Sequence, residues 1–344
     1  SRGLGDVYKR QKPVMIPGTL KGTKAIGWYI PEYGIAQVSM NITDINATPL
    51  HAAFDEVSRA AAARGVRVTG AEIVGLVPRR TLIEAGKHYL RLQQRSAGIP
   101  DDEIIRTAII SMGLSELKPF DVNEKIIENR ISKPDTDALT AMTCRRFAYE
   151  TASESPAPGG GSISAYMGAL GAALATMVAN LSAHKPGWDA RWEEFSEVAE
   201  KGQKLTDRLL ALVDEDTAAF NRVMDAFKLP KGTPEEKAAR TEAIQQATFY
   251  AAEVPLHTME AASEAFPLLM QMARTGNPAS ASDAGVGALA ARSAILGAEL
   301  NVRINAASLT DRSQADKLIE KAKKLAAEAC AAEKEILAEV ESKL

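Results

Sequence analysis

The spacing of apolar residues differs between the first third of the chain and the rest. Ile26, Trp28 and Ile30 alternate with smaller or more polar residues, and the stretch AQVSMNIT at residues 36–43 alternates in the same way. Alternation of this kind predicts two half-buried strands. A third, short strand is expected at residues 66–68, directly before the run TGAEIVGLVP.

Helical patterns follow the second and the third of these predicted strands. The first helix is expected to begin at Thr48 and Pro49, because a capping threonine followed by proline is typical of a helix start, and to end at Gly65. Two more helices are expected at about residues 81–95 and 101–112. Strands and helices mixed on this scale predict an α/β (α+β) sandwich, one sheet with helices on a face.

After a polar stretch without periodicity, the chain has only helical patterns. Residues 192–223 keep helical spacing, and residues 238–272 do so with breaks expected at Pro255 and Pro267. Residues 311–344 place one apolar stripe opposite their charges, as on the outer helix of a bundle. The sequence therefore predicts a multidomain protein, with an α/β domain over residues 12–127, a linker over 128–140 and an all-α helical bundle over 141–344.

The run PAPGGGSISAYMGALGAALATMVANLSA, residues 156–183, contains no charged residue. Its glycines Gly159, Gly160 and Gly161 precede a predicted helix, with Ser162 available as a cap. The free N–H groups of a helix start favour an anion, so either a phosphate or carboxylate site or an ordinary glycine-rich loop is expected here. Small residues at helical spacing and several polar side chains favour a buried helix over a membrane span.

Composition narrows the classes of protein that remain. With 344 residues the chain is long enough for two cores, and a net charge of −3 gives no electrostatic case for binding nucleic acid. Cys144 and Cys330 are the two cysteines, which provide neither a disulfide framework nor the spacing of metal ligands. No signal-peptide pattern is present, so we expect a cytoplasmic protein. The chain begins with Ser1, and we expect it to lack its own beginning.

Polar residues at positions where a bundle core favours aliphatic side chains are the candidates for chemistry. Asp216 lies near the apolar stripe of its helix, so a role at a site and a solvated position are both open, whereas Asp214 and Glu215 favour a solvated face. Asn301 and Asn305 are four residues apart on one helical face and can present two amides to one ligand. The remaining candidates each have a structural alternative as a helix end, a cap or a turn: His184, Lys185, Asp283, Gly70 and Glu72.

Several of these motifs, in the same order, resemble the cyclodeaminase domain of the formiminotransferase-cyclodeaminase family. They are the run at residues 159–180, VDEDTAAF at 213–220, LPKGTPEEKAAR at 229–240, EVPL at 253–256 and SDAGVGALAARSAILGAELNVRIN at 282–305. The segments KAIGWYIPEYGIAQVSMNITD, TPLHAAFDEV and TGAEIVGLVP are similar to the C-terminal subdomain of the formiminotransferase half, over about residues 14–127. The family's N-terminal subdomain, with its catalytic histidine, is expected to be missing, and Ala71 stands where the family usually has serine.

The resemblance implies a folate-dependent one-carbon enzyme of histidine degradation. Its reaction would convert 5-formiminotetrahydrofolate to 5,10-methenyltetrahydrofolate and ammonia, with tetrahydrofolate as co-substrate and no metal. The implied partners are the folate, including its polyglutamylated form, and further copies of the chain in a homo-oligomer, with no nucleic acid and no membrane. Formiminoglutamate would be a substrate only with the missing subdomain. A methenyltetrahydrofolate cyclohydrolase and a folate-binding scaffold without turnover are the alternatives.

The resemblance also suggests roles for the candidate residues. Asp216 is the first choice for the acid that protonates the leaving nitrogen, with Lys185 and His184 next. The helix start would hold a carboxylate of the folate glutamate. Pterin or amidine contacts would come from Asp283, Asn301 and Asn305, with Asn277 and Ser282 in the same stretch. Gly70 and Glu72 would be folate contacts of the transferase half.

Overall fold

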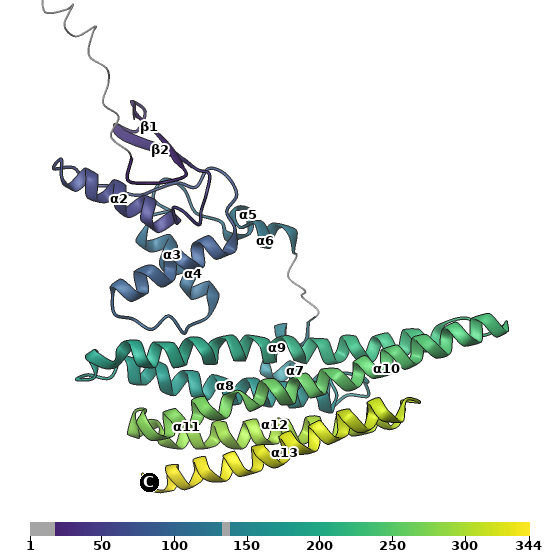
Figure 1. Ribbon diagram of the computed structural model, residues 1–344. Coiled ribbons are helices and arrows are strands. Elements are labelled where there is room, and N and C mark those ends of the chain that lie inside the picture. Colours follow the sequence, from purple (N-terminus) through teal and green to yellow (C-terminus); the bar gives the residue numbers. More distant parts are fainter. Residues whose placement is uncertain (1–17, 133–137) are drawn as a thin grey trace, which may run out of the picture. The chain divides into compact units, whose positions relative to one another are not determined.

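A computed structural model describes residues 18–132 and 138–344 (Figure 1). The chain divides into two compact units, the first comprising the residues up to Tyr89 with Ile105–Ile131, the second comprising Leu90–Ile104 with Ser132–Leu344. Residues 12–17 of the predicted first domain and 133–137 of the predicted linker lie outside the described residues. The predicted domain limits stay a prediction.

The first unit contains a β-hairpin and several helices, as the sequence predicts. Strands β1 (Thr23–Ile30) and β2 (Ile35–Ile42) pair antiparallel, with Thr23 opposite Ile42 and Ile30 opposite Ile35. The helices are α2 (Leu50–Ala62), α3 (Arg79–Leu92), α4 (Asp101–Ser111), α5 (Val122–Lys125) and α6 (Ile127–Ile131). The core of this unit is formed mainly by α3, α4 and the segment around Ile126, with Leu82, Met112 and Ile126 fully buried.

The strand expected at residues 66–68 is wrong. This segment is irregular, and Val66 is 60% exposed. The N–H of Val66 donates to the carbonyl of Ala61 at 3.1 Å and closes the end of α2, with Gly65 at φ +74°. The branched side chains of this segment favour a strand, but the hydrogen bond that closes the end of α2 determines its structure instead.

The second unit is helical throughout its described residues, as the sequence predicts. Its α-helices are α7 (Cys144–Thr151), α8 (Gly160–Ala183), α9 (Trp192–Lys228), α10 (Pro234–Ser263), α11 (Ala265–Thr275), α12 (Ala281–Ala307) and α13 (Arg312–Glu341). Short 3-10 turns lie at Leu139–Ala141, Asp189–Arg191 and Pro278–Ser280. The core stripe predicted on α13 is present, with Ala322, Ala329, Ile336 and Val340 buried.

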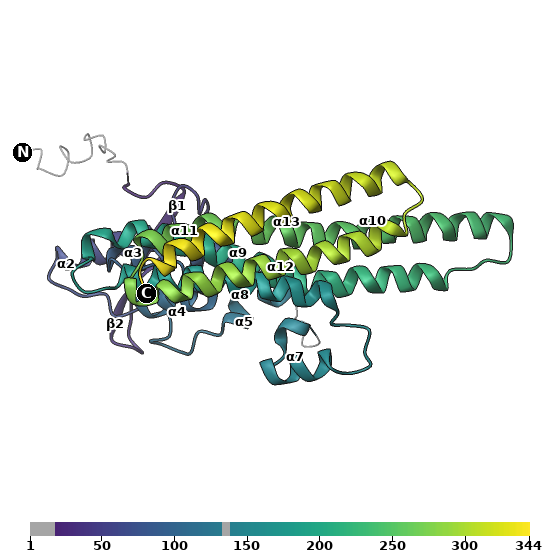
Figure 2. The same cartoon turned by 90° about the horizontal axis from the view of Figure 1, so that it is seen from below.

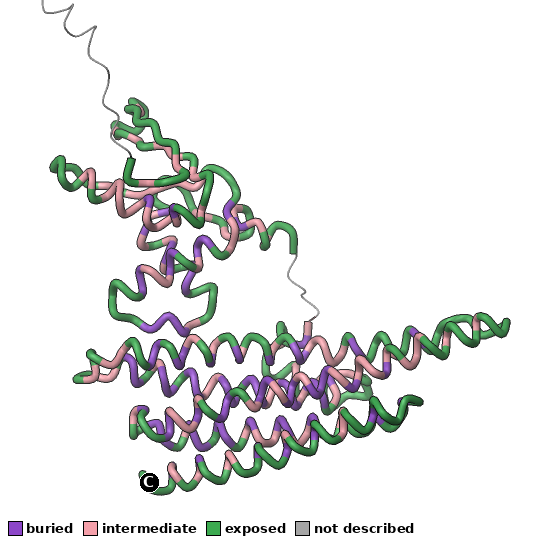
Figure 3. Tube along the Cα trace, in the orientation of Figure 1, coloured by how far each residue is buried: buried purple, intermediate pink, exposed green. Residues whose placement is uncertain are grey.

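Helix α8 is the central helix of the second unit and packs against α9 and α12 (Figure 3). Its small residues allow close approach: a Cβ placed on Gly171 would lie 2.9 Å from the carbonyl oxygen of Gly287 on α12. By length and composition α8 passes the test for a membrane span, but 61% of its most apolar window is buried inside the unit. The predicted buried helix is therefore what the structure shows.

Helix α10 runs through Pro255, so the break predicted there is wrong. Proline has no N–H to donate to the carbonyl four residues before it, which is that of Ala251. The side-chain amide of Asn305, on α12, donates to this carbonyl at 2.6 Å and replaces the missing backbone bond. The helix instead ends at Ser263, and Pro267 lies in the first turn of α11.

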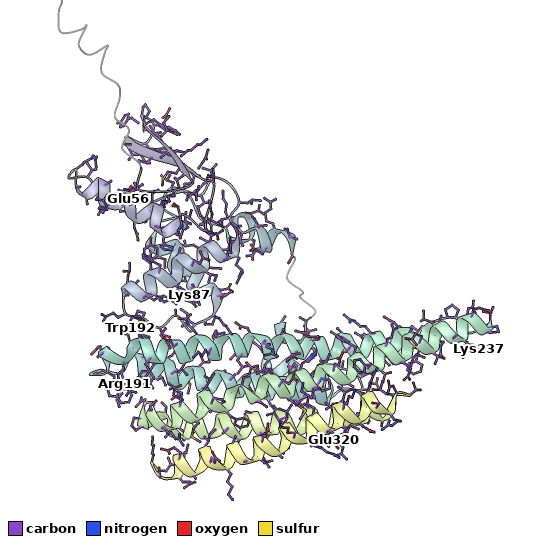
Figure 4. The ribbon with its side chains drawn as sticks, in the orientation of Figure 1. Glu56, Lys87, Arg191, Trp192, Lys237 and Glu320 are labelled. Carbon is purple, nitrogen blue, oxygen red and sulfur yellow. The ribbon has the colours of Figure 1, made fainter. Side chains whose placement is uncertain are left out.

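Helices α9 and α10 form a long hairpin that extends beyond the start of α8 (Figure 2). Its turn is fixed by a capping box, in which the backbone N–H of Glu236 donates to Thr233 Oγ1 at 3.2 Å and the N–H of Thr233 donates to Glu236 Oε2 at 3.1 Å. Lys237, labelled in Figure 4, lies near the tip of this hairpin.

The segment Leu90–Ile104 folds with the helical unit. The backbone N–H of Ala97 donates to Ser196 Oγ on α9 at 3.0 Å, and Asn180 Nδ2 on α8 donates to the carbonyl of Gly98 at 2.8 Å. A Cβ on Gly98 would lie 2.2 Å from the carbonyl carbon of Ala199. Only glycine fits this close contact between the segment and α9.

Candidate functional site

The side chain of Asp216, on α9, contacts the first turn of α8. Its carboxylate accepts a hydrogen bond from Ser162 Oγ at 2.9 Å and another from the backbone N–H of Ser162. A Cβ on Gly161 would lie 2.0 Å from Asp216 Oδ1, so the carboxylate occupies the space that any other residue would fill. The anion expected at this helix start is therefore a side chain of the protein itself.

Burial sets the protonation of this carboxyl group. Desolvation raises the pKa of Asp216 above its ordinary value, and the two hydrogen bonds from Ser162 oppose part of that rise. Thr217 Oγ1 lies 3.4 Å from Ser162 Oγ and extends the polar group. A carboxyl group with a raised pKa, surrounded by few polar atoms, is suited to hold and release a proton.

Of the two asparagines on α12, Asn301 lies beside Gly160, and Asn305 contacts α10. A Cβ on Gly160 would lie 3.2 Å from Asn301 Nδ2, and this nitrogen donates to the carbonyl of Gly297 at 2.9 Å. Asn305 instead donates to the carbonyl that Pro255 leaves free. The structural need of α10 accounts for the amide nitrogen of Asn305, and a ligand shared by the two amides stays a prediction.

The remaining candidates of the helical unit lie at the other end of α8. The rise over residues 162–184 is about 33 Å, and the rise over residues 283–301 of α12 is about 27 Å. His184 Nε2 accepts the backbone N–H of Ser96 at 3.5 Å, and Lys185 Nζ lies 4.0 Å from the centre of the Trp188 ring. His184, Lys185, Asn277, Ser282 and Asp283 are thus too far from Asp216 to act with it in one copy of the chain.

These distant residues have local structural contacts. The N–H of Asn277 donates to Ser182 Oγ at 2.8 Å, and its side chain accepts the N–H of Ala279 at 3.3 Å, which caps a turn. Burial and the nearby Arg95 lower the pKa of His184. Their roles in substrate binding stay a prediction without support from this geometry.

In the first unit, Gly70 and Glu72 are held by the chain around residue 113. A Cβ on Gly70 would lie 2.8 Å from the carbonyl oxygen of Gly113, and Glu72 Oε1 lies 2.6 Å from Lys118 Nζ. Close packing explains the glycine, and an ion pair engages the acid. A folate contact at these two residues stays a prediction.

Two residues that the sequence analysis missed, Arg222 and Tyr250, contact each other near Glu215, the neighbour of Asp216. Tyr250 on α10 donates its hydroxyl hydrogen to Glu215 Oε1 at 2.6 Å, and the guanidinium carbon of Arg222 lies 4.5 Å from the centre of the Tyr250 ring. Arg222 and Tyr250 line an open groove of about 440 Å³ between α9 and α10. Glu215 and Arg222 are seven residues apart and share a helical face, which is the signal that could have linked them.

Across the described residues, no group of three or more His, Cys, Asp or Glu side chains has the arrangement of a metal site.

Comparisons with known proteins agree on one family. Residues 143–324 match the formiminotransferase-cyclodeaminase family, and residues 2–132 match the formiminotransferase domain. The formimidoyltransferase-cyclodeaminase of Rattus norvegicus is 38% identical over 297 residues, which are 86% of this chain and 54% of that protein. The chain thus spans about half the length of the curated relatives of this kind that it matches.

Two relatives correspond to the helical unit alone. The methenyltetrahydrofolate cyclohydrolase of Methylorubrum extorquens is 40% identical over 202 residues, which are 59% of this chain and 97% of that protein. The crystal structure of formiminotetrahydrofolate cyclodeaminase from Thermotoga maritima matches with a TM-score of 0.52 and 26% identity, over 58% of this chain and 96% of that one.

Proposed function

This chain belongs to the formiminotransferase-cyclodeaminase family, and we propose that its helical unit converts 5-formiminotetrahydrofolate to 5,10-methenyltetrahydrofolate and ammonia. The observation that carries the proposal is the half-buried carboxyl group of Asp216, held by Ser162 at the start of α8 in a space that Gly161 leaves open. The named relatives that cover this unit supply the reaction class.

The chemistry requires proton transfer at a defined position. N10 of the folate attacks the formimino carbon on N5, a new N10–C bond forms, and the bond from that carbon to the amidine nitrogen breaks. N10 loses its proton, and the departing nitrogen must gain protons to leave as ammonia rather than as an amide anion. A protonated Asp216 carboxyl group can deliver one of them. Its raised pKa makes the protonated form easier to reach than in an exposed aspartate.

The surrounding residues position this acid and the substrate. The Ser162 hydrogen bonds fix one orientation of the Asp216 carboxyl group, and the Asn301 side chain beside Gly160 is placed to contact a bound amidine or pterin. Holding N10 and the formimino carbon at reaction distance contributes several kcal/mol by itself. The long α9–α10 hairpin extends the wall of the site beyond the start of α8.

Asp216→Asn tests this assignment, because it removes the proton donor and keeps the shape. Turnover should fall about a hundredfold or more, and folate affinity should change little. Asp207→Asn is the control: Asp207 is on the same helix at a more exposed position, its pKa is also raised, and it accepts a hydrogen bond from Gln203 at 3.0 Å. Small, equal effects of the two substitutions would contradict the role of Asp216.

Asp214 is unsuitable as a control because its carboxylate has a structural role. It accepts the N–H of Leu139 at 2.7 Å and the hydroxyl of Thr140 at 2.6 Å. This finding differs from the solvated position that the sequence predicts for Asp214. Its substitution would change the start of the helical unit.

The cyclohydrolase remains the second candidate, because that relative is covered over 97% of its length. The two activities differ in their products: the cyclodeaminase forms the methenyl compound and releases ammonia, whereas the cyclohydrolase consumes the methenyl compound and water. Absorbance of the methenyl compound and an ammonia assay, run on the same sample, distinguish them. Folate binding without either signal would favour the scaffold.

The wider setting also belongs to this proposal. The first unit would form part of a formimidoyltransferase half, with formiminoglutamate as its substrate in the complete enzyme. We propose a cytoplasmic homo-oligomer that uses tetrahydrofolate as co-substrate and needs no metal. Exposed apolar side chains on neighbouring helices support self-association, among them Leu170 and Leu181 on α8 and Leu289 on α12. Light scattering on the purified chain measures the number of copies.

A further inference from the structure

The groove between α9 and α10 combines an aromatic ring, a cation and apolar side chains. Tyr250, Arg222, Gln246 and Leu229 are among its lining residues, and its volume is about 440 Å³. Arg222 follows Asp216 on α9 by a rise of about 9 Å toward the tip of the hairpin. The groove is therefore close to the proposed acid but separate from it.

A folate substrate needs a second anion site at some distance from the acid. Its glutamate carboxylates are separated from N10 by the p-aminobenzoyl ring and an amide bond. The start of α8 already holds the carboxyl group of Asp216, bonded to both the side chain and the backbone of Ser162. A substrate carboxylate placed there would compete for the same hydrogen-bond donors.

The residues that line the groove include one cation, Arg222, and one carboxylate, that of Asp225. The Asp225 carboxylate is paired with Lys228 at 2.8 Å. Glu215 accepts the hydroxyl of Tyr250 at 2.6 Å. In the part of the chain that the structure describes, Arg222 forms no ion pair, and its guanidinium lies over the Tyr250 ring.

This arrangement allows the Arg222 guanidinium to bind a carboxylate. A guanidinium has five N–H donors, so its hydrogen bond to the Tyr250 side chain leaves others available, and its planar fork can bind a carboxylate with two parallel hydrogen bonds. The ring and the alanine and leucine side chains beside it offer apolar surface to a flat aromatic group.

We propose that Arg222 binds a glutamate carboxylate of the folate substrate, with the p-aminobenzoyl ring lying in the groove against Tyr250. The inference rests on the proposed function, because it assumes that the reacting atoms bind at Asp216. It replaces the start of α8 as the carboxylate site, and it makes Arg222 a residue for substrate binding rather than for proton transfer.

The test compares two stable ligands that differ only in the glutamate. Equilibrium titrations measure the affinities of 5-formyltetrahydrofolate and of 5-formyltetrahydropteroate, which lacks the glutamate. The wild-type chain should prefer the glutamate-bearing ligand by about tenfold to a hundredfold, the range expected for a hydrogen-bonded charge pair. Arg222→Gln should abolish this preference and leave the affinity for the pteroate unchanged. Arg222→Lys, which keeps the charge without the fork, should retain part of it.

Lys237→Gln is the control, because it removes a positive charge from the same hairpin outside the groove. It should keep the wild-type preference. A preference that survives in Arg222→Gln, or that is lost equally in Lys237→Gln, overturns the assignment. If the wild-type chain binds both ligands equally, the Arg222 proposal fails while folate binding stands. If it binds neither, the proposed function fails as well.

Discussion

Replacement of Gly161 by alanine tests the geometry of the site with a single methyl group. Elsewhere in a helix this change removes the entropy cost of glycine and stabilises by about 1 kcal/mol. Here the new Cβ would lie 2.0 Å from Oδ1 and 2.5 Å from Cγ of Asp216, so the carboxyl group must move away. The Asp216 side chain then loses its hydrogen bonds to Ser162.

The balance of these effects predicts the sign. A hydrogen bond to a charged group contributes about 1.5–3 kcal/mol, and a buried carboxyl group left without partners adds a desolvation cost. The loss outweighs the propensity gain, so the free energy of unfolding should fall by about 1–3 kcal/mol. Turnover should fall about a hundredfold or more, because the displaced acid no longer faces the leaving nitrogen.

Urea unfolding and the methenyl absorbance assay measure the two effects in parallel. Gly285→Ala is the control, because a Cβ there would have its nearest neighbour at 3.5 Å, an ordinary contact, and should leave turnover unchanged and raise stability. Wild-type turnover in Gly161→Ala would refute the reasoning, since it would mean that the position of Asp216 does not matter for the reaction.

Two further predictions concern stability. Asn305→Ala should lower the free energy of unfolding by about 1–3 kcal/mol, because it leaves the Ala251 carbonyl unpaired. The loss of stability should be clearly smaller in a Pro255→Ala background, where a backbone N–H can donate to this carbonyl instead. Equal losses in both backgrounds would exclude this coupling. The free energy of unfolding should also decrease as pH falls below 6.5 toward the lowered pKa of His184, since the folded state binds fewer protons there than the unfolded state. His184→Gln should make this slope smaller in urea titrations at several pH values, and an unchanged slope would count against it.

Periodicity predicted most of the helical unit because its helices each bury one continuous face. The stripe of α13 and the long pattern of α9 needed no knowledge of their partners. Asp216 was identified from the same helical periodicity, because its position in the helical repeat lies beside the apolar stripe of α9. The predictions of a strand at residues 66–68 and of a helix break at Pro255 were wrong because other parts of the chain determine these structures. The end of α2 determines the first, and the side chain of Asn305 on α12 determines the second.

The candidate site could be predicted only in part. Sequence motifs at both ends of α8 were assigned to one substrate, although the rise of the helix separates them by about 33 Å. That separation was available from the sequence alone. Arg222 and Tyr250 carried no comparable signal, because their contact joins exposed faces of two helices across the hairpin turn.

The docking of residues 90–104 into the helical unit has a consequence for how the protein is made. During synthesis the segment leaves the ribosome long before its partners: Gly98 and Asn180 are 82 residues apart, and Ala97 and Ser196 are 99 residues apart. Contacts of such long sequence separation form slowly, because a large loop must close first. Until α8 and the first turns of α9 have been translated, the N–H of Ala97 and the carbonyl of Gly98 lack their native partners. One of the first segments of the helical unit to be synthesised is therefore placed only after the start of α9 has been made.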